Sequence, residues 1–215
     1  MTTSDRRPLA SRDTSWARAI TRWLVRTSIT PNQISMASMG AAALAGICFW
    51  TGGMAEGWPR AALFVIAALF CQLRLLCNLF DGLVAVEGGK QAADGPFWNE
   101  FPDRVADILI LVGAGLGAAE PTLGWAAAAF AVLTAYVREL GRANGLATDF
   151  RGPMAKQHRM AVMTLAALVS ATASLWSAAG MAVVIALWLV IVGAVLTALR
   201  RAVRIVASLK DRERG

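Results

Sequence analysis

The chain has 215 residues, of which 57% are hydrophobic and only 16% are charged. Soluble domains average about 45–50% apolar and about 25% charged residues, so this composition excludes an ordinary soluble domain. The net charge of +7 suits either nucleic acid or an anionic membrane surface as a partner. The three cysteines lie inside apolar runs without ligand-like spacing, which excludes a disulfide framework and a cysteine zinc site.

The N-terminal residues predict a helix that lies in the membrane interface. No short apolar region with a small-residue cleavage site is present, so no removable signal peptide is expected. Over residues 14–27, apolar side chains recur on one helical face: Trp16, Ile20, Trp23 and Leu24. The arginines of this segment lie on the opposite face of the helix. A solvated basic arm is the alternative, but the tryptophans would then gain nothing from the interface.

Six apolar stretches are long enough to cross about 30 Å of hydrocarbon as helices. They cover residues 32–53, 59–86, 103–119, 122–144, 158–179 and 181–203. The sequence therefore predicts an all-α, polytopic membrane protein with six transmembrane helices. We expect residues 1–215 to form one integral membrane domain. It comprises the interfacial helix 14–27, a six-helix catalytic part over 32–203 and a basic tail over 204–215.

The distribution of basic residues predicts the orientation. Arginine and lysine gather before the first span, around the fourth loop and after the last span, whereas the first loop has only Arg60 and the third and fifth have none. By the positive-inside rule, both termini, the second loop and the fourth loop face the cytoplasm. The excess charge then faces anionic lipid, so nucleic-acid binding is not expected. The expected location is a bacterial cytoplasmic membrane.

Polar residues gather where the second and third spans reach the cytoplasmic side. Helical spacing places Arg74, Asn78 and Asp81 on one face. Asn99, Asp103 and Asp107 share a face of the next helix. Three uncompensated carboxylates at membrane depth would cost on the order of 5–10 kcal/mol.

A hydrated divalent cation would remove this cost, and oxygen ligands of this kind suit magnesium, manganese or calcium. The alternative is that the polar side chains only snorkel, cap helices or pair with Arg74 and Arg104. Asp107 lies deepest in its span and is the hardest to explain in that way. Gly82, Ala85 and Gly95 remove side chains beside the carboxylates. They would let a bulky group approach, or they serve ordinary packing between helices.

This stretch resembles the signature of the CDP-alcohol phosphotransferase family, Asp-x2-Asp-Gly-x2-Ala-Arg-x8-Gly-x3-Asp-x3-Asp. The chain has Asn78-x2-Asp81-Gly82-x2-Ala85-Val86-x8-Gly95-x3-Asn99-x3-Asp103. Asparagine thus replaces the first and third aspartates, and Val86 replaces the arginine. Residues 30–35, with Asn32, also look like the entry motif of the family.

The resemblance implies a CDP-linked substrate at the membrane face, two Mg²⁺ or Mn²⁺ ions on its diphosphate, and a final aspartate that deprotonates the acceptor hydroxyl. CMP would leave, and the donor would be CDP-diacylglycerol or a CDP-alcohol. The implied metal ligands are Asn78, Asp81, Asn99, Asp103 and Asp107. Each asparagine removes one negative charge, so in the gapless alignment of the motif we expect weaker metal binding and one tight ion in place of two. The resemblance also implies a homodimer.

Two alignments of the final aspartates are open. In the gapless register Asp103 is the base and Asp107 a helper. In the second register, shifted by one helical turn, Asp103 is a ligand and Asp107 the base. From the sequence we favour the second register because it gives Asp107, deep in its predicted span, a role.

Further residues are expected to bind substrate. The resemblance and the small side chains indicate Asn32, Gly82, Ala85 and Gly95. Arg74 could contact the diphosphate in place of Val86, or serve as a charge partner for Asp81. A pocket for an acidic acceptor or a lipid headgroup would use Arg138, Arg142, Lys156 and Arg159, although most basic residues in such loops only set topology.

The sequence is also compatible with two alternatives to a phosphatidyltransferase-type enzyme. An intramembrane prenyltransferase could use Asn78-x2-Asp81 and Asp103-x3-Asp107 as two diphosphate motifs, but it would give Gly82 and Ala85 no role. A non-catalytic scaffold or divalent-ion transporter is the other alternative. The two asparagines and Val86 are the best support for it.

Overall fold

The computed structural model describes residues 14–173 and 181–214. The seven helices of this part are α1 (Ser15–Val25), α2 (Pro31–Met54), α3 (Gly57–Glu87), α4 (Gly95–Gly117), α5 (Pro121–Ala143), α6 (Lys156–Ala171) and α7 (Ala182–Arg214). No strand occurs within the described ranges, so the prediction of an all-α protein is confirmed. The predicted boundary between the spans 158–179 and 181–203 lies outside the described residues.

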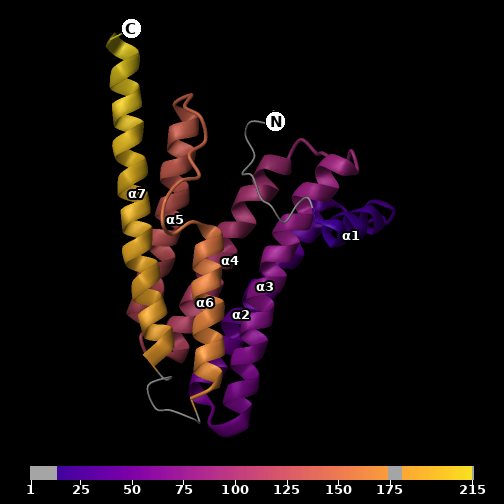
Figure 1. Cartoon of the computed structure of the whole chain (residues 1–215), viewed down its shortest axis with the longest axis vertical. Helices are drawn as coiled ribbons and strands as arrows, with labels where there is room; N and C mark the ends of the chain where they lie inside the picture. Colours follow the sequence, from indigo (N-terminus) through magenta and orange to yellow (C-terminus); the bar gives the residue numbers. More distant parts are fainter. Residues whose placement is uncertain (1–13, 174–180, 215) are drawn as a thin grey trace.

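The helices α2 to α7 run roughly along the length of the molecule, and α1 lies crosswise at one side, beside the C-terminal part of α3 (Figure 1). The α2–α3 connection lies at the bottom of the view, and the C-terminal end of α7 extends beyond α1 at the top (Figure 1). Buried alanines, methionines and larger apolar side chains of α2 to α7 form the main core. The arrangement leaves the polar ends of α2, α3 and α4 close to α1.

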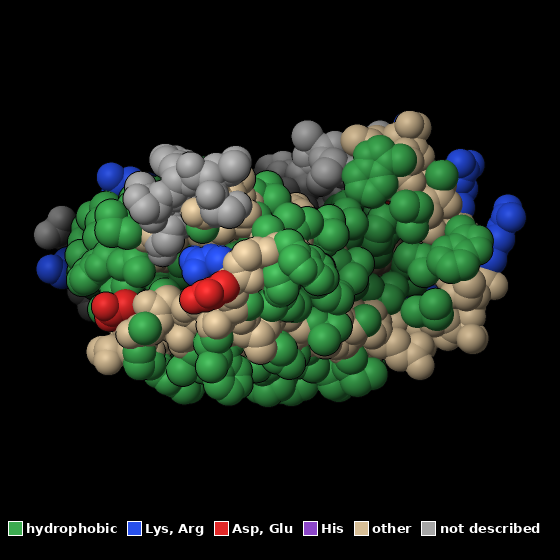
Figure 2. Space-filling view, turned by 90° about the horizontal axis from the view of Figure 1, so that it is seen from below, with side chains coloured by type: hydrophobic (Ala, Val, Ile, Leu, Met, Phe, Trp, Pro, Cys, Tyr) green, Lys and Arg blue, Asp and Glu red, His purple; other side chains and the backbone are tan. Residues whose placement is uncertain are grey.

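Four helices are long and apolar enough to cross a membrane: α2, α3, α5 and α7. The expected six spans are therefore not confirmed. The N-terminal half of α4 carries charged residues that interrupt its apolar character, and the described part of α6 has only 16 residues. Figure 2 views the end opposite α1, where the surface is largely hydrophobic with few charges. Trp58 and Trp125 are exposed large hydrophobic residues.

Glycines allow α2 and α4 to pack backbone against backbone. A Cβ atom on Gly46 would lie 2.3 Å from the Leu109 carbonyl oxygen, and one on Gly113 would lie 2.3 Å from the Gly46 oxygen. Such distances leave no room for any side chain. This close contact holds α4, and with it Asp103 and Asp107, in a fixed position against α2.

The predicted amphipathic helix is present as α1. Ala17, Thr21 and Leu24 are its buried residues. Leu24 belongs to a small apolar cluster with residues of α2 and α3, such as Leu83. The rings of Trp16 and Phe80 meet edge to face with centroids 6.1 Å apart. Trp23, with 62% of its surface exposed, remains available to a lipid interface.

Candidate functional site

A cavity of about 680 Å³ lies among the helices, with Trp16 of α1 on its wall. Residues from α1 to α7 and from the connections 88–94 and 144–155 line it. Most of the residues predicted from the sequence lie on its wall: Asn32, Asn78, Asp81, Gly82, Ala85, Gly95, Asn99, Asp103, Arg138, Arg142, Lys156 and Arg159. Segments that are far apart in the sequence thus contribute to one site.

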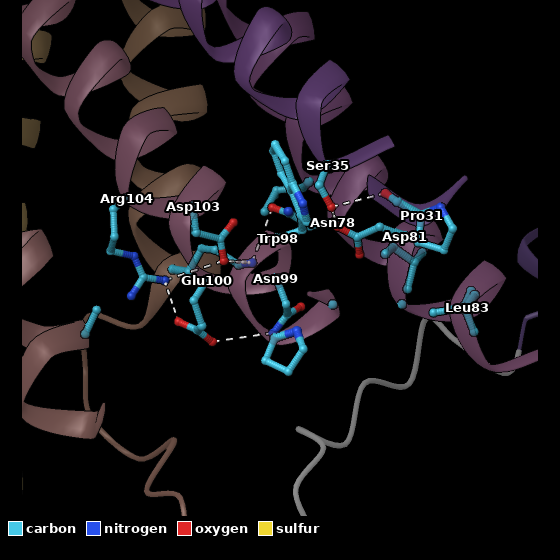
Figure 3. Close-up of a pocket in the computed structure, with 18 of the residues that line it drawn as sticks. Pro31, Ser35, Asn78, Asp81, Leu83, Trp98, Asn99, Glu100, Asp103 and Arg104 are labelled. Carbon is cyan, nitrogen blue, oxygen red and sulfur yellow. Dashed lines mark hydrogen bonds and ion pairs between the residues drawn. The ribbon is translucent and has the colours of Figure 1, made fainter. Parts of the chain in front are cut away.

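Asp81 faces the cavity from α3 beside the start of α2. Its Oδ2 accepts a hydrogen bond of 2.8 Å from the Ser35 hydroxyl, which also donates to the Pro31 carbonyl oxygen. In Figure 3, Asn78 lies between Asp81 and Asp103. The capping box of Thr30 and Gln33 fixes the first turn of α2 and therefore the position of Ser35.

A lysine from α6 joins the polar faces of α3 and α4. Lys156 Nζ lies 2.5 Å from Asp103 Oδ2 and 3.3 Å from Asn78 Oδ1. Arg104 Nη2 lies 3.6 Å from the same Asp103 oxygen. Asp103 is nearly buried but lines the cavity, so its carboxylate is held in place by cations at the cavity wall.

Arg74 and Asp107 are the two predicted site residues that do not line this cavity. Both are fully buried. Arg74 Nη2 lies 3.2 Å from Asp107 Oδ1 and 3.4 Å from Asp103 Oδ1. The charge partners of Arg74 are therefore the aspartates of α4, whereas the sequence suggested Asp81.

The other Asp107 oxygen, Oδ2, lies 2.5 Å from Arg159 Nη2. Arg159 also donates to the Met154 carbonyl oxygen at 2.9 Å. Both carboxylate oxygens of Asp107 are thus engaged by guanidinium groups. Asp107 lies one helical turn deeper than Asp103. Because the two guanidinium groups neutralise its charge, it can be accommodated within the helix bundle.

The small residues of the motif leave space beside the carboxylates. A Cβ atom built on Gly82 or on Gly95 would meet no heavy atom within 4 Å, and both glycines line the cavity. Here the small residues keep the cavity open and do not serve close helix packing. That packing instead involves Gly46 and Gly113 on the interface between α2 and α4.

Asn32 and Asn99 lie at the outer part of the cavity wall. The Asn32 side-chain amide donates to Asp94 Oδ2 at 3.1 Å, which joins the start of α2 to the residue before α4. Asn99 is exposed, and its amide donates to Glu100 Oε1 at 3.4 Å. Figure 3 shows Asn99 and Glu100 close to Arg104.

The predicted basic pocket is partly neutralised by acidic neighbours. Arg138 pairs with Glu100 and, at 3.1 Å, with Glu139. Arg142 lies 3.6 Å from the other Glu139 oxygen. These pairs place carboxylates as well as guanidinium groups on the wall, so the pocket offers both hydrogen-bond acceptors and donors to a polar molecule.

Sequence reasoning missed Arg201, a nearly buried residue of α7 on the cavity wall. Its Nη1 donates to the Thr134 carbonyl oxygen at 2.8 Å and its Nε to the Arg151 oxygen at 3.1 Å. Helical spacing could have revealed it, because Arg201 lies four residues after the buried Thr197 and on the same face. Ser35 and Glu100 were also not predicted as site residues.

A divalent cation needs several oxygen ligands that converge on one point. Within residues 14–173 and 181–214, no group of three His, Cys, Asp or Glu side chains converges on one point. Asp103 Oδ2 and Asn78 Oδ1 already contact Lys156. Asp81 and Asn99 also line the cavity, and their side-chain oxygens are of the kind that a divalent cation binds.

No family model matches the chain. It is 24% identical over 155 residues to the inner membrane protein YnbA of Escherichia coli, across 72% of this chain and 74% of YnbA. It is 25% identical over 195 residues to phosphatidylinositol phosphate synthase of Streptomyces avermitilis, across 85% of this chain and 75% of the synthase. These relatives also indicate a multi-pass membrane protein, in agreement with the four long apolar helices.

The fold is similar to that of solved phosphatidylinositol phosphate synthases. The crystal structure of PgsA1 of Mycobacterium tuberculosis with CDP-DAG bound aligns with a TM-score of 0.72 and 20% identity, across 87% of this chain and 92% of PgsA1. The PgsA1 complex with manganese and citrate also gives a TM-score of 0.72. These matches confirm the resemblance to the CDP-alcohol phosphotransferase family that the motif indicated.

Proposed function

We propose that this chain is a membrane enzyme of the CDP-alcohol phosphotransferase type. It displaces CMP from CDP-diacylglycerol, or from a CDP-alcohol, and transfers the substituted phosphate to a hydroxyl acceptor. One of the two relatives and the fold neighbours are phosphatidylinositol phosphate synthases, and one solved structure has CDP-DAG bound. They favour this reaction over prenyl transfer.

The proposal rests on one observation: the residues of the motif line the same cavity. Asp81 and Asp103 face one space of about 680 Å³, and the glycines of the motif leave that space open. Pockets for small molecules have about this volume, and a few polar groups usually orient the ligand in them. The diphosphate would lie beside Gly82 and Gly95, with the lipid part leaving toward the exposed apolar helix surfaces.

The geometry favours the gapless register of the motif. Asp103 lies on the cavity wall, whereas Asp107 is fully buried behind it between two guanidinium groups. We therefore assign Asp103 as the base that takes the proton of the acceptor hydroxyl, because a base must lie within hydrogen-bond reach of that proton. Asp107 becomes a positioning residue that holds Arg74 and Arg159.

A divalent ion, Mg²⁺ or Mn²⁺, would offset negative charge on the diphosphate as CMP leaves. Asp81 and Asn99 are the residues we assign to hold it. Ser35 orients Asp81 through its hydrogen bond. Arg104 and Lys156 hold the Asp103 carboxylate at the cavity wall.

The direct test is CMP release by the detergent-purified protein from CDP-diacylglycerol, with Mg²⁺ or Mn²⁺ against EDTA and a broad set of acceptors. We expect metal-dependent CMP that Asp81→Ala and Asp103→Ala abolish. Glu87→Gln is the matched control, because this exposed carboxylate near the end of α3 lies outside the cavity wall. The absence of CMP from CDP-diacylglycerol and from CDP-alcohols would favour the scaffold alternative.

The proposed topology has six spans, with α4 and α6 included and with both termini in the cytoplasm. A helix of the length of α4 extends about 35 Å, enough to cross the hydrocarbon region. Its buried carboxylates are paired with cations, which lowers the cost of membrane burial. The variants Glu87→Cys and Glu120→Cys, each in a Cys-free background, should label with a membrane-impermeant maleimide from opposite sides of the membrane.

The acceptor hydroxyl compound and the expected homodimer belong to the same proposal. The mixed acidic and basic wall around Arg138 and Glu100 would bind a polar acceptor such as a polyol or its phosphate. Competition between unlabelled polyols and polyol phosphates in the CMP assay would identify the class. Light scattering of the detergent complex would measure the number of chains.

A further inference from the structure

We propose that the ammonium group of Lys156 takes the place of a second metal ion in this site and binds the substrate diphosphate directly. This inference rests on the proposed function and specifies its cofactor requirement: one divalent ion and one lysine. It differs from a topological role for the basic fourth loop, because it concerns a side chain that reaches across the bundle to two other helices.

The position of Lys156 carries the argument. The residue begins α6, and its Nζ lies between a carboxylate oxygen of Asp103 on α4 and the amide oxygen of Asn78 on α3. Two oxygen donors from different helices thus converge on one cation. Oxygen donors of this kind would also suit a divalent ion, but the ammonium fills the position between them.

The charge of the surrounding residues agrees with a monovalent cation. At position 78 an amide contributes a neutral oxygen, so the pair Asn78 and Asp103 carries one negative charge. Asp103 already lies beside Arg74 and Arg104, so a divalent ion in place of the monovalent Lys156 would add still more positive charge around one carboxylate. An amide at position 78 and a lysine at position 156 therefore form a matched pair.

Lys156 is also accessible to a ligand. Its side chain keeps 29% of its surface exposed and lines the cavity, in contrast to the buried Arg74. An ammonium group has three donors, and Asn78 and Asp103 use two of them. The third can reach a phosphate oxygen beside the open space at Gly82, where charge-assisted hydrogen bonds are strong.

Lys90 provides a matched control. It is the other lysine on the cavity wall, but its Nζ donates to the backbone carbonyl oxygens of Thr27 and Ile29, at 2.7 and 3.3 Å. Lys90→Gln removes the same charge from the cavity as Lys156→Gln. It leaves the Asn78–Asp103 pair unchanged.

The experiment counts bound Mn²⁺ ions by electron paramagnetic resonance in the full-length detergent-purified protein, without substrate. We expect one tightly bound ion per chain for the wild type, for Lys90→Gln and for Asn78→Asp. The double variant Asn78→Asp/Lys156→Gln should bind two ions, because it replaces the neutral oxygen by a carboxylate and removes the ammonium. Two tight ions in the wild type, or one ion in a double variant with a wild-type melting temperature, would overturn the proposal.

A second measurement keeps the proposal testable if the double variant does not fold. In EDTA, CDP should bind to the wild type and to Lys156→Arg, and Lys156→Gln should weaken this binding at least tenfold. Equal CDP binding by Lys156→Gln and Lys90→Gln would contradict the assignment. The Mn²⁺ count does not depend on turnover. An inactive protein that still shows the change from one ion to two would contradict the proposed transferase activity, but not the proposal that Lys156 replaces a second metal ion.

Discussion

The guanidinium of Arg159 lies 2.5 Å from an Asp107 carboxylate oxygen, and neither side chain has more than 3% of its surface exposed. Arg74 contacts the other oxygen of the same carboxylate. Asp107 therefore connects α3, α4 and α6 directly behind the cavity wall. Arg74 and Asp107 form a buried support behind Asp103, whereas Arg159, Asp103 and Lys156 line the wall itself.

Asp107 is expected to act on stability more than on chemistry. Asp107→Ala leaves two buried guanidinium groups without their shared partner and should lower the free energy of unfolding by about 3–5 kcal/mol. Asp107→Asn keeps the shape and one of the two hydrogen-bond acceptors, so it should destabilise the protein less than Asp107→Ala and retain CMP release within about tenfold. Thermal unfolding in detergent and the CMP assay measure the two effects. A folded Asp107→Asn protein without any turnover would instead support the second register.

Asp103→Asn should remove catalysis from a folded protein. The amide keeps the size of the side chain but cannot accept the proton of the acceptor hydroxyl, and loss of a general base lowers rates by about 10²–10⁴-fold. We expect kcat to fall by this factor with little change in KM for the CDP-linked substrate. Glu87→Gln, with an equal change of charge, should leave both constants unchanged.

The close contact between α2 and α4 predicts a strong effect of side-chain size at Gly113. Its Cβ would lie 2.3 Å from the Gly46 carbonyl oxygen, so Gly113→Val should force the helices apart and destabilise the protein by about 1–3 kcal/mol or more. Gly40→Ala on α2 is the control, because a Cβ there meets no heavy atom within 4 Å. Its melting temperature should be unchanged or higher.

A larger side chain at Gly82 should impair substrate binding and leave stability unchanged, in contrast to one at Gly113. Gly82→Leu places a side chain into the open space of the cavity, where it should block the diphosphate and raise KM for the CDP-linked substrate at least tenfold. The melting temperature should stay within a few degrees of the wild type, because a Cβ at Gly82 meets no protein atom within 4 Å. Equal losses of stability in Gly82→Leu and Gly113→Val would contradict the distinction between cavity glycines and packing glycines.

The connection between α5 and α6 should loosen in acid. Partial burial by itself would raise the pKa of Asp149, but hydrogen bonds from the Arg151 amide and side chain and from Arg204 lower this pKa below its ordinary value. The carboxylate therefore stabilises the loop fully above the unfolded pKa of about 3.9. This stabilisation is lost as the pH falls through the lower folded value.

Hydrogen exchange of the Arg151 and Met154 amides, corrected for intrinsic rates, measures this effect. Protection should be constant from neutral pH to about pH 5 and decline in stronger acid. Asp149→Asn should lower the protection at neutral pH to the level that the wild type reaches in acid. A decline of equal size in Asp149→Asn would assign the acid effect to another group.

Much of the architecture follows from local patterns. The apolar runs and their basic flanks predicted a helical membrane protein, and the spacing of Trp16, Ile20 and Trp23 predicted α1. The motif from Asn78 to Asp103 predicted which residues share a cavity. These results depend on helix periodicity and on the cost of polar groups in hydrocarbon, and both can be read from sequence separation alone.

The roles of the charged side chains were decided only by the tertiary structure. Sequence spacing could not show that Arg74 and Arg159 enclose Asp107, nor that Lys156 reaches Asp103 from 53 residues away. Partner choice among buried charges depends on which helices pack together and how closely, and that depends on contacts such as Gly46 against Gly113. The sequence thus determined the helical character and the motif, while the packing of α3, α4 and α6 decided that Asp103 lines the cavity and that Asp107 is buried behind it.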